Sequence, residues 1–207
     1  MEHVTSRQNP LVRRFREIAR EGRLGEHILL DGEHLVEEAL GSDITLEVVV
    51  FDPASAQGAL AKLATRCSAT QARVITVPEA LLAAMSPVRT ASGVVAIGRL
   101  MQRTVDQALE QAPQLVIFLD RVQDPGNVGA IIRAAEGCGA TAVIAGPGTA
   151  DPLGWKALRG AMGSTLRLPV ASAASLSPAL GAARAAGVRL FAMVARGGVP
   201  LAEADLA

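Results

Sequence analysis

The chain has 207 residues, half of them hydrophobic, and its 20 basic and 20 acidic side chains give a net charge of zero. This length and apolar content suffice for one large or two small domains, and the charge balance excludes a protein that is basic over its whole surface. No apolar run reaches the roughly 18 residues of a membrane span, and the first residues, MEHVTSRQNP, lack the apolar core of a signal peptide. We therefore expect a cytoplasmic protein without a membrane segment.

Arginine is concentrated at the start of the chain. Lys62 and Lys156 are the two lysines, so arginine supplies 18 of the 20 basic residues. A local cluster of arginines is an electrostatic footprint for phosphate groups, although the outer face of an ordinary amphipathic helix has the same composition. The pattern favours contact with a nucleic acid, and the amphipathic helix stays open as the alternative. The arginines of this N-terminal cluster are Arg7, Arg13, Arg14, Arg16, Arg20 and Arg23.

The cysteines and histidines form no recognised framework. Cys67 and Cys138 lie far apart on expected helices, which indicates two buried thiols in a reducing compartment. His3, His27 and His34 have no metal-ligand spacing. We therefore expect neither a disulfide nor a bound metal.

Strands and helices alternate over the first hundred residues. Asn9 is expected to cap a helix whose first residue is Pro10 and which fades near residues 21–22. The alternation is typical of a mainly parallel sheet covered on both faces, and it predicts a small α/β domain over residues 1–100. Strands are predicted at 27–30, 45–51, 73–77 and 93–97, and helices at 33–40, 55–67 and 78–85.

A polar segment of helical composition separates this domain from a second one. Pro113 resets the chain after it, so we expect a linker at 101–113 and a second domain at 114–207. Within the second domain, residues 115–146 are typical of a strand, a polar loop, a helix and another strand. Further helices are predicted at 153–162 and 177–186, and further strands at 165–170 and 188–194.

The loop after the strand at 115–119 is the predicted site. Asp124, Pro125, Gly126 and Asn127 are turn and cap formers, and we expect Asn127 to cap a helix that starts near residue 128. In open parallel sheets, ligands bind beyond the carboxyl ends of strands, where loops turn into helices. This loop occupies that position.

The helix after the loop separates its residues by face. At 100° per residue, Arg133 points away from the sheet, among Gly129, Ala130 and Gly137. Side chains this small leave room for another backbone, a subunit or a ligand. The alternative for Arg133 alone is an ordinary solvated arginine. The face predicted to pack on the sheet contains Val128, Ile131, Ile132, Ala135 and Cys138.

These residues carry a resemblance to a known family. The run Asp124 to Ala135, with Gly139 behind it, resembles the first motif of the SpoU/TrmH family of RNA ribose 2′-O-methyltransferases, in the SPOUT superfamily. Residues 3–98 also resemble the substrate-binding domain that many ribosomal-RNA members carry. Ala161 stands where many members have serine. The family's next block is matched by Lys156, Arg159, Met162, Gly163 and Leu168–Pro169.

The resemblance implies transfer of a methyl group from S-adenosylmethionine to a ribose 2′-hydroxyl of RNA, most often ribosomal RNA, with transfer RNA as the other class. It assigns the functional Asn and Arg to Asn127 and Arg133. Because arginine stays protonated, Arg133 would stabilise the developing alkoxide and clamp a neighbouring phosphate. The resemblance also implies a homodimer. The residues predicted to bind RNA are Arg7, Arg13, Arg14 and Arg16, together with Lys156 and Arg159, which share a helix face.

Two further motifs of the family are missing from this sequence. In the family they build a deep trefoil knot that holds the cofactor, whereas this chain stops at Leu206–Ala207. The expected fold is therefore two α/β domains, of which the second is a parallel-sheet SPOUT-like domain that stops before its knot. The chain as it stands is expected to be inactive, and no cofactor-binding residues can be assigned in it.

The alternative function is a non-catalytic RNA-binding scaffold. A third alternative, a nucleotide-binding Rossmann protein, is disfavoured because the loop lacks the glycine fingerprint. Trp155 is expected either to stack on a base or to pack at a domain contact.

Overall fold

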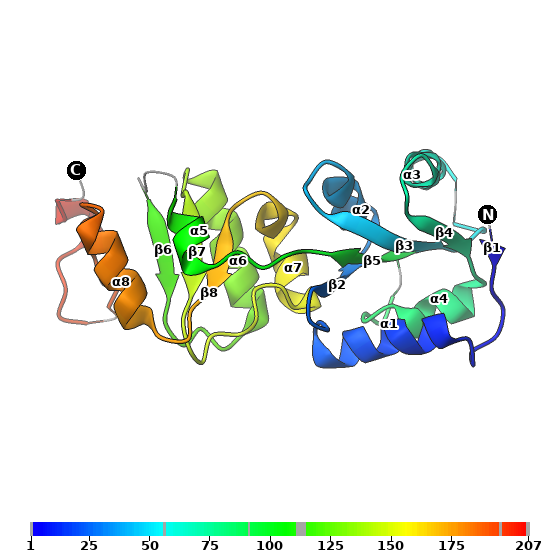
Figure 1. Cartoon of the computed structure of the whole chain (residues 1–207), viewed down its shortest axis with the longest axis horizontal. Helices are drawn as coiled ribbons and strands as arrows, with labels where there is room; N and C mark the ends of the chain where they lie inside the picture. Colours follow the sequence, from blue (N-terminus) through cyan, green and yellow to red (C-terminus); the bar gives the residue numbers. More distant parts are fainter. Residues whose placement is uncertain (1, 56, 91, 111–114, 195, 206–207) are drawn as a thin grey trace.

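A computed structural model describes residues 2–55, 57–90, 92–110, 115–194 and 196–205. It contains two β-sheets, which lie one after the other along the long axis of the molecule (Figure 1). The strands of the first sheet precede helix α5 (Val105–Leu109) in the chain, and those of the second sheet follow it. Each sheet has helices on both faces, so the α/β class expected from the sequence is confirmed.

The first sheet is mixed. Its strand order is β1-β4-β3-β5-β2; β1 and β3 run parallel to β4, whereas β5 runs antiparallel to both β3 and β2. We call the first sheet with the helices on its faces the first half of the molecule, and the second sheet with its helices the second half. The prediction of a mainly parallel sheet is wrong for the first half, because alternation of strands and helices does not fix the direction of each strand. The strands are β1 (Glu2–His3), β2 (His27–Asp31), β3 (Thr45–Phe51), β4 (Arg73–Thr76) and β5 (Val94–Arg99).

Neighbouring residues of its strands pack on opposite faces. Leu29 and Val50 belong to the core under α1 and α4, whereas Leu30 and Val49 belong to the core under α2 and α3. This period of two is the pattern of strands buried on both sides. Figure 1 shows α1 and α4 below the sheet and α2 and α3 above it. These helices are α1 (Pro10–Glu21), α2 (Glu33–Leu40), α3 (Ala59–Ser68) and α4 (Glu79–Met85).

Helix α1 begins and ends as its sequence predicts. The Asn9 side chain accepts a hydrogen bond from the backbone N–H of Leu11 at 2.9 Å, and Pro10 occupies the first helical position. The helix ends before Gly22, whose φ of 89° is readily adopted only by glycine. The predicted start of α3 was less accurate, because the Asp52 side chain holds the backbone of Ala54 and the hydroxyl of Ser55 in a turn.

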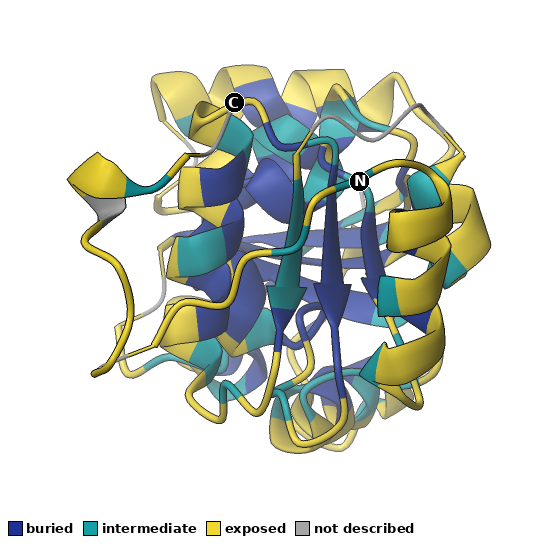
Figure 2. Ribbon diagram, turned by 90° about the vertical axis from the view of Figure 1, so that its left-hand side faces the viewer, coloured by how far each residue is buried: buried dark blue, intermediate teal, exposed yellow. Residues whose placement is uncertain are grey.

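The second sheet is parallel, as predicted. It consists of β6 (Val116–Leu119), β7 (Ala142–Ala145) and β8 (Val170–Ser172) in that order. Figure 2 shows the buried strand β7 in dark blue beside β6, which is mostly teal, between helices whose outer surfaces are yellow. Helices α5 and α8 cover one face, and α6 and α7 cover the other. The bounds of the remaining helices are α6 (Pro125–Gly137), α7 (Trp155–Ala161) and α8 (Leu176–Ala185).

Two predicted strands of this half differ from the structure. The segment 165–170 contains the end of a 3-10 turn, Ser164–Leu166, and β8 begins only at Val170. The reason is that Met162 and Gly163 both have positive φ values and turn the chain sharply before it can extend. The segment 188–194 forms no strand, and Phe191 and Met193 are 54% and 84% exposed. It pairs with no strand within the described part of the chain, and an apolar run without a pairing partner does not become a strand.

The predicted linker contains a packed helix. Thr104 and Gln107 form a capping box at the start of α5, and Ala108 is buried in the core beside β7 and β8. Arg103 also forms a bridge with Ala171 of β8. The first part of this segment thus packs on the second sheet, whereas residues 111–114 lie outside the described part.

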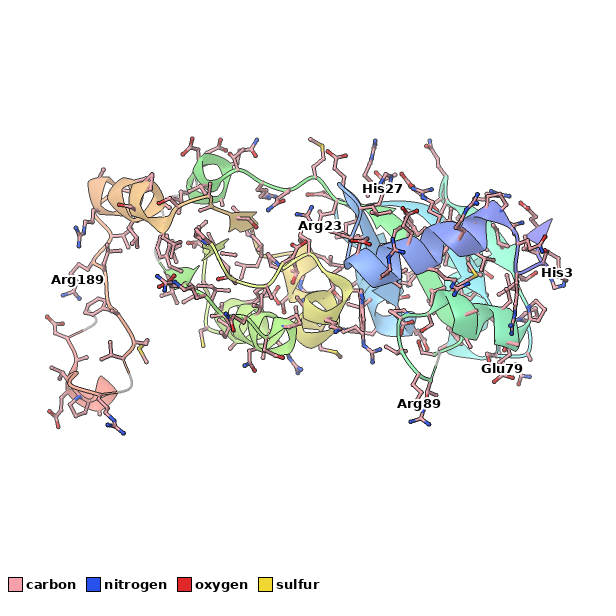
Figure 3. All side chains as sticks on the ribbon, turned by 90° about the horizontal axis from the view of Figure 1, so that it is seen from below. His3, Arg23, His27, Glu79, Arg89 and Arg189 are labelled. Carbon is pink, nitrogen blue, oxygen red and sulfur yellow. The ribbon has the colours of Figure 1, made fainter. Side chains whose placement is uncertain are left out.

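Helix α7 joins the two halves. Leu158, and Leu153 just before the helix, are buried in the core beneath α2 and α3 of the first half. The indole N–H of Trp155 donates to the carbonyl of Ala19 at 2.8 Å. Trp155 therefore packs at the contact between the halves, the second of the two roles expected for it. Arg23, labelled in Figure 3, binds Asp151 from the same side.

None of the described helices combines the length and apolar character of a membrane span.

Candidate functional site

The loop after β6 leads into α6 through an aspartate cap. The Asp124 carboxylate accepts a hydrogen bond from the backbone N–H of Asn127 at 2.8 Å, and Pro125 is the first helical residue. The prediction that Asn127 caps the helix is therefore wrong. Proline suits the first position because the N–H it lacks has no helical partner, so the cap lies one residue before it. Asn127 becomes the third residue of the helix, and its exposed side-chain amide has no hydrogen-bond partner among the described residues.

The assignment of the cap to Asp124 predicts different effects of two substitutions on the stability of the protein. Asp124→Ala is expected to lower the stability of the protein by about 1 kcal/mol, because it removes the cap. Asn127→Ala is expected to stay within about 0.5 kcal/mol of the parent protein, since it changes an exposed helical side chain. Thermal unfolding of the two variants side by side measures the difference. Equal losses of stability in both would contradict the assignment of the cap to Asp124.

The face of α6 that packs on the sheet is close to the predicted one. Val128, Ile132 and Ala135 are buried and Ile131 is half-buried. Cys138 is exposed, against the prediction, because the helix ends at Gly137 and the helical spacing no longer applies.

Of the two predicted buried thiols, Cys67 is the one that is buried. Burial raises the pKa of the Cys67 thiol, and the charge of Arg66 partly offsets that rise. The Cys67 thiol therefore stays protonated, like a small apolar side chain.

Arg133 lies on the exposed side of α6, as predicted. Its guanidinium forms no ion pair or hydrogen bond with any residue that the structure describes. Asn127 lies six residues earlier on the same helix, about 9 Å along the axis and about 120° around it. The two side chains are thus joined through the helix backbone, and the structure shows no contact by which Asn127 would hold Arg133.

Gly129 lies at the crossing of α6 and α7. A Cβ atom at this position would lie 2.7 Å from the backbone nitrogen of Ala161 and still closer to the carbonyl oxygen of Ala157. The placement of Gly129 on an open outer face is therefore wrong, since the backbone that approaches it belongs to α7 of the same chain. Ala130 and Gly137 are exposed, as predicted.

The two basic residues of α7 have different surroundings. The Lys156 ammonium lies 5.4 Å from the centre of the Trp155 ring. Arg159 lies against the first half, with its Nη1 atom 3.5 Å from Oδ1 of Asp31. Both side chains remain accessible to solvent, but the structure shows no contact between them.

Asp31 is a residue that the sequence did not reveal as part of the site. It ends β2 and its side chain is only 3% exposed; the Ser86 hydroxyl donates to it at 2.6 Å. Burial raises the pKa of the Asp31 carboxyl, although the Ser86 hydrogen bond and the Arg159 charge oppose that rise. In the sequence, Asp31 and Gly32 have the signature of an ordinary turn before a helix, which conceals this role.

The arginines of α1 line a hollow. It measures about 700 Å³, and the residues at its surface come from the exposed face of the helix and the loop before it. Arg14 is not among them, because its guanidinium lies 2.7 Å from the Glu47 carboxylate on β3. In Figure 1, α1 lies on the side of the molecule toward which the strands of the second sheet point. The lining residues are Arg7, Gln8, Arg13, Arg16, Glu17 and Arg20.

Two family models match the chain. Residues 9–96 match the MRM3-like substrate binding domain, and residues 114–207 match the SpoU rRNA Methylase family. The 23S rRNA (guanosine(2553)-2′-O)-methyltransferase RlmP of Bacillus subtilis is 30% identical over 206 residues, which cover 98% of this chain and 77% of that protein. The 23S rRNA (guanosine-2′-O-)-methyltransferase RlmB of Burkholderia sp. is 32% identical over 170 residues, covering 79% of this chain and 68% of that protein.

A solved structure of an rRNA methyltransferase has a similar fold. The AdoMet-bound rRNA methyltransferase from Sinorhizobium meliloti superimposes with a TM-score of 0.74 at 28% identity, covering 89% of this chain and 69% of that one. The family models, the two relatives and this superposition together identify an RNA methyltransferase of the SPOUT class. Within that class, the chain belongs to the SpoU rRNA methylase family, and S-adenosylmethionine is the methyl donor of this family.

The described residues do not fit this cofactor. A nucleoside cofactor needs an enclosed, mostly apolar slot with a few polar groups, whereas Phe191 and Met193 lie in exposed coil after α8. A hollow of about 480 Å³ lies among residues 191–205, beyond α8 and away from α6.

Proposed function

We propose that this protein takes part in the S-adenosylmethionine-dependent methylation of a ribose 2′-hydroxyl in RNA, with ribosomal RNA as the substrate. The observation that carries the proposal is the exposed guanidinium of Arg133, which pairs with no described residue, on the helix that follows the carboxyl end of β6. The similarity to RlmP and RlmB, whose names both specify 2′-O-methylation of 23S rRNA, supports the substrate class.

In this proposal Arg133 and Asn127 act on the ribose. A 2′-hydroxyl is a poor nucleophile at neutral pH, and charge develops on its oxygen as it attacks the methyl group. Arg133 remains protonated, so it stabilises that charge and holds the adjacent phosphate. Because Asp124 caps the helix, the Asn127 amide is available to hold the sugar or the phosphate beside it.

The proposed RNA interface extends from α1 to α7. Arg7, Arg13 and Arg16 contribute through the hollow on α1, and Arg20 joins them because it lines the same hollow. Arg14 contributes less, since Glu47 already neutralises it. On α7, Lys156 and Arg159 extend the interface toward the first turn of α6.

Charge reversal on α1 tests this interface. Arg13→Glu with Arg16→Glu is expected to weaken binding of transcribed 23S rRNA and to flatten its salt dependence. Each lost phosphate contact removes about 0.9 from the slope of log K against log salt if the RNA behaves as a duplex. Filter binding at a series of salt concentrations gives both quantities.

The matched control has the same change in net charge on the other side of the sheet. Lys62→Glu with Arg66→Glu alters two basic residues of α3, which lies opposite α1. This control is expected to retain most of the affinity and the slope. An unchanged slope in the α1 variant, or equal losses in both, would show that α1 is not the RNA interface.

We also propose a division of the chain into an RNA-binding domain at 1–100, a connecting segment at 101–113 and a methyltransferase domain at 114–207. The family models, which match 9–96 and 114–207, support this division. Helix α5, although it lies in the connecting segment, packs with the second domain. A cytoplasmic location fits an enzyme that acts on ribosomal RNA.

A homodimer is the proposed assembly. Its support is the exposed apolar side chains Phe191, Met193 and Val199 after α8, and the small exposed residues Ala130 and Gly137 on α6. Apolar patches of this kind mark association surfaces. Light scattering over a range of concentrations measures the mass, and a monomer at every concentration would contradict the proposal.

Methyl transfer and cofactor binding separate the two candidate functions. Transfer of tritiated methyl from S-adenosylmethionine to transcribed 23S rRNA is the expected result for the methyltransferase. RNA binding without transfer, and without heat of S-adenosylmethionine binding in calorimetry, would instead identify a scaffold. The exposed coil at 188–194 is the observation that favours this second function.

A further inference from the structure

A buried carboxylate of the first half is paired with an arginine of the second. Asp31 ends β2 in the first sheet, and its side chain is almost fully enclosed. The Ser86 hydroxyl donates to one carboxylate oxygen, Oδ2, at 2.6 Å. The other oxygen, Oδ1, faces Nη1 of Arg159 at 3.5 Å, across the contact between the halves. The neutralising charge for Asp31 therefore comes from α7.

The fold alone does not account for this arrangement. Burial of a carboxylate is costly unless it is paired and hydrogen-bonded, and an apolar residue of the same size would pack here at lower cost. Leu29 and Leu30, which precede Asp31 on β2, are fully buried and apolar. An acidic residue at the end of such a strand indicates a role for its charge.

Arg159 keeps most of its hydrogen-bonding capacity for another partner. A guanidinium has five N–H donors, and the one approach to Asp31 is longer than an ordinary hydrogen bond. The Arg159 side chain is 43% exposed. Asp31 thus attracts the Nη1 end of the guanidinium toward the first half, while much of the side chain stays accessible to solvent.

The position of Arg159 on α7 brings it next to the candidate active site. The following residue, Gly160, lies at the crossing with α6, where an added Cβ would be 3.0 Å from the Gly126 carbonyl oxygen. Gly126 immediately precedes Asn127 in the first turn of α6. The backbone of Arg159 is therefore held beside the turn that carries Asn127.

We propose that Asp31 is a positioning residue, which orients Arg159 so that its accessible side chain binds a phosphate of the RNA beside the first turn of α6. The inference rests on the proposed function, in which Arg159 contacts RNA. It adds that the substrate-binding half supplies an acidic residue that shapes the site, so the two halves form one binding surface.

The test is a double-mutant cycle read by filter binding of transcribed 23S rRNA and by thermal unfolding. Arg159→Ala is expected to lower the salt slope by about one phosphate contact, roughly 0.7 to 0.9. Asp31→Asn keeps the hydrogen bond from Ser86 but removes the charge. It is expected to weaken RNA binding about three- to tenfold, the cost of ordering one long side chain, with the slope unchanged.

The double variant distinguishes positioning from folding. Arg159→Ala leaves the Asp31 carboxylate buried and unpaired, so it also lowers the melting temperature, and Asp31→Asn added to it should restore that temperature. In the Arg159→Ala background, Asp31→Asn should have no further effect on RNA affinity, because the side chain that it orients is gone. A merely structural role of Asp31 would not produce this dependence.

Each failure has a distinct meaning. An Arg159→Ala protein with the parent salt slope would remove Arg159 from the proposed RNA interface. A lower slope for Arg159→Ala, combined with unchanged or tighter RNA binding by Asp31→Asn, would overturn the positioning role alone. Ser86→Ala, which removes one of the two serine hydrogen bonds to the carboxylate and leaves that of Ser92, is a second variant if Asp31→Asn does not fold. It is expected to weaken binding in the same direction.

Discussion

Replacing Arg133 by alanine is expected to lower methyl transfer at least about a hundredfold, the usual cost of removing a donor that stabilises charge in a transition state. The melting temperature should change by no more than about 2 °C, because an exposed helical side chain that pairs with none of the described residues contributes little to folding. The measurement is tritium transfer to transcribed 23S rRNA. Parent and variant are compared in a longer form of the protein that carries the two further motifs of the family.

Two further variants identify what the guanidinium supplies. Arg133→Lys keeps the charge but loses the planar, bidentate geometry, so it should recover only part of the activity. Arg184→Ala makes the same chemical change on the exposed face of α8 and should leave activity unaltered. Full activity in Arg133→Ala would show that Arg133 is an ordinary solvated arginine.

The local signals in this sequence predicted most of the helices and strands. The Asn9–Pro10 pair fixed the start of α1, and the bounds of α2 and β3 agree with the prediction to the residue. These elements depend on capping and on the spacing of apolar residues, which act over a few positions. The order and direction of the strands of the first sheet depend on long-range pairing, so the sequence pattern did not contain them.

The site was predictable in part. The loop after β6 and the outward direction of Arg133 follow from helical spacing and hold in the structure. The cap was misplaced because four successive residues all favour turns, and only the fixed position of Pro125 distinguishes Asp124 from Asn127. Asp31 was missed because its partner, Arg159, lies in the other half of the chain and becomes its neighbour only through packing.

Gly129 illustrates a related limit of helical spacing. The spacing correctly separates the faces of α6, but it does not say which element covers each face. The absence of a side chain at Gly129 indicated a close approach, and the structure supplies α7 as the approaching element. A close approach predicted from small residues therefore needs a structure before it is assigned to a subunit contact.

Gly129→Ala is expected to destabilise the protein by about 3 kcal/mol, at the upper end of the cost of overpacking a core. The added Cβ would be 2.7 Å from the Ala161 nitrogen and 2.8 Å from the Gly160 Cα. Because the colliding atoms belong to the backbone, no rotation of a side chain relieves the overlap, and α7 must move away from α6. At about 2–4 °C per kcal/mol for a protein of this size, the melting temperature should fall by roughly 6–12 °C.

Gly137→Ala is the matched control, because it places the same methyl group on the same helix with nothing within 4 Å of it. It is expected to leave stability unchanged or to raise it by up to about 1 kcal/mol, since alanine favours a helix more than glycine does. The movement of α7 in Gly129→Ala should also separate Arg159 from Asp31, so RNA binding should weaken in that variant and not in the control. Equal melting temperatures for the two variants would contradict the close crossing at Gly129. Unchanged RNA binding in a destabilised Gly129→Ala protein would show that the position of α7 does not control the RNA interface.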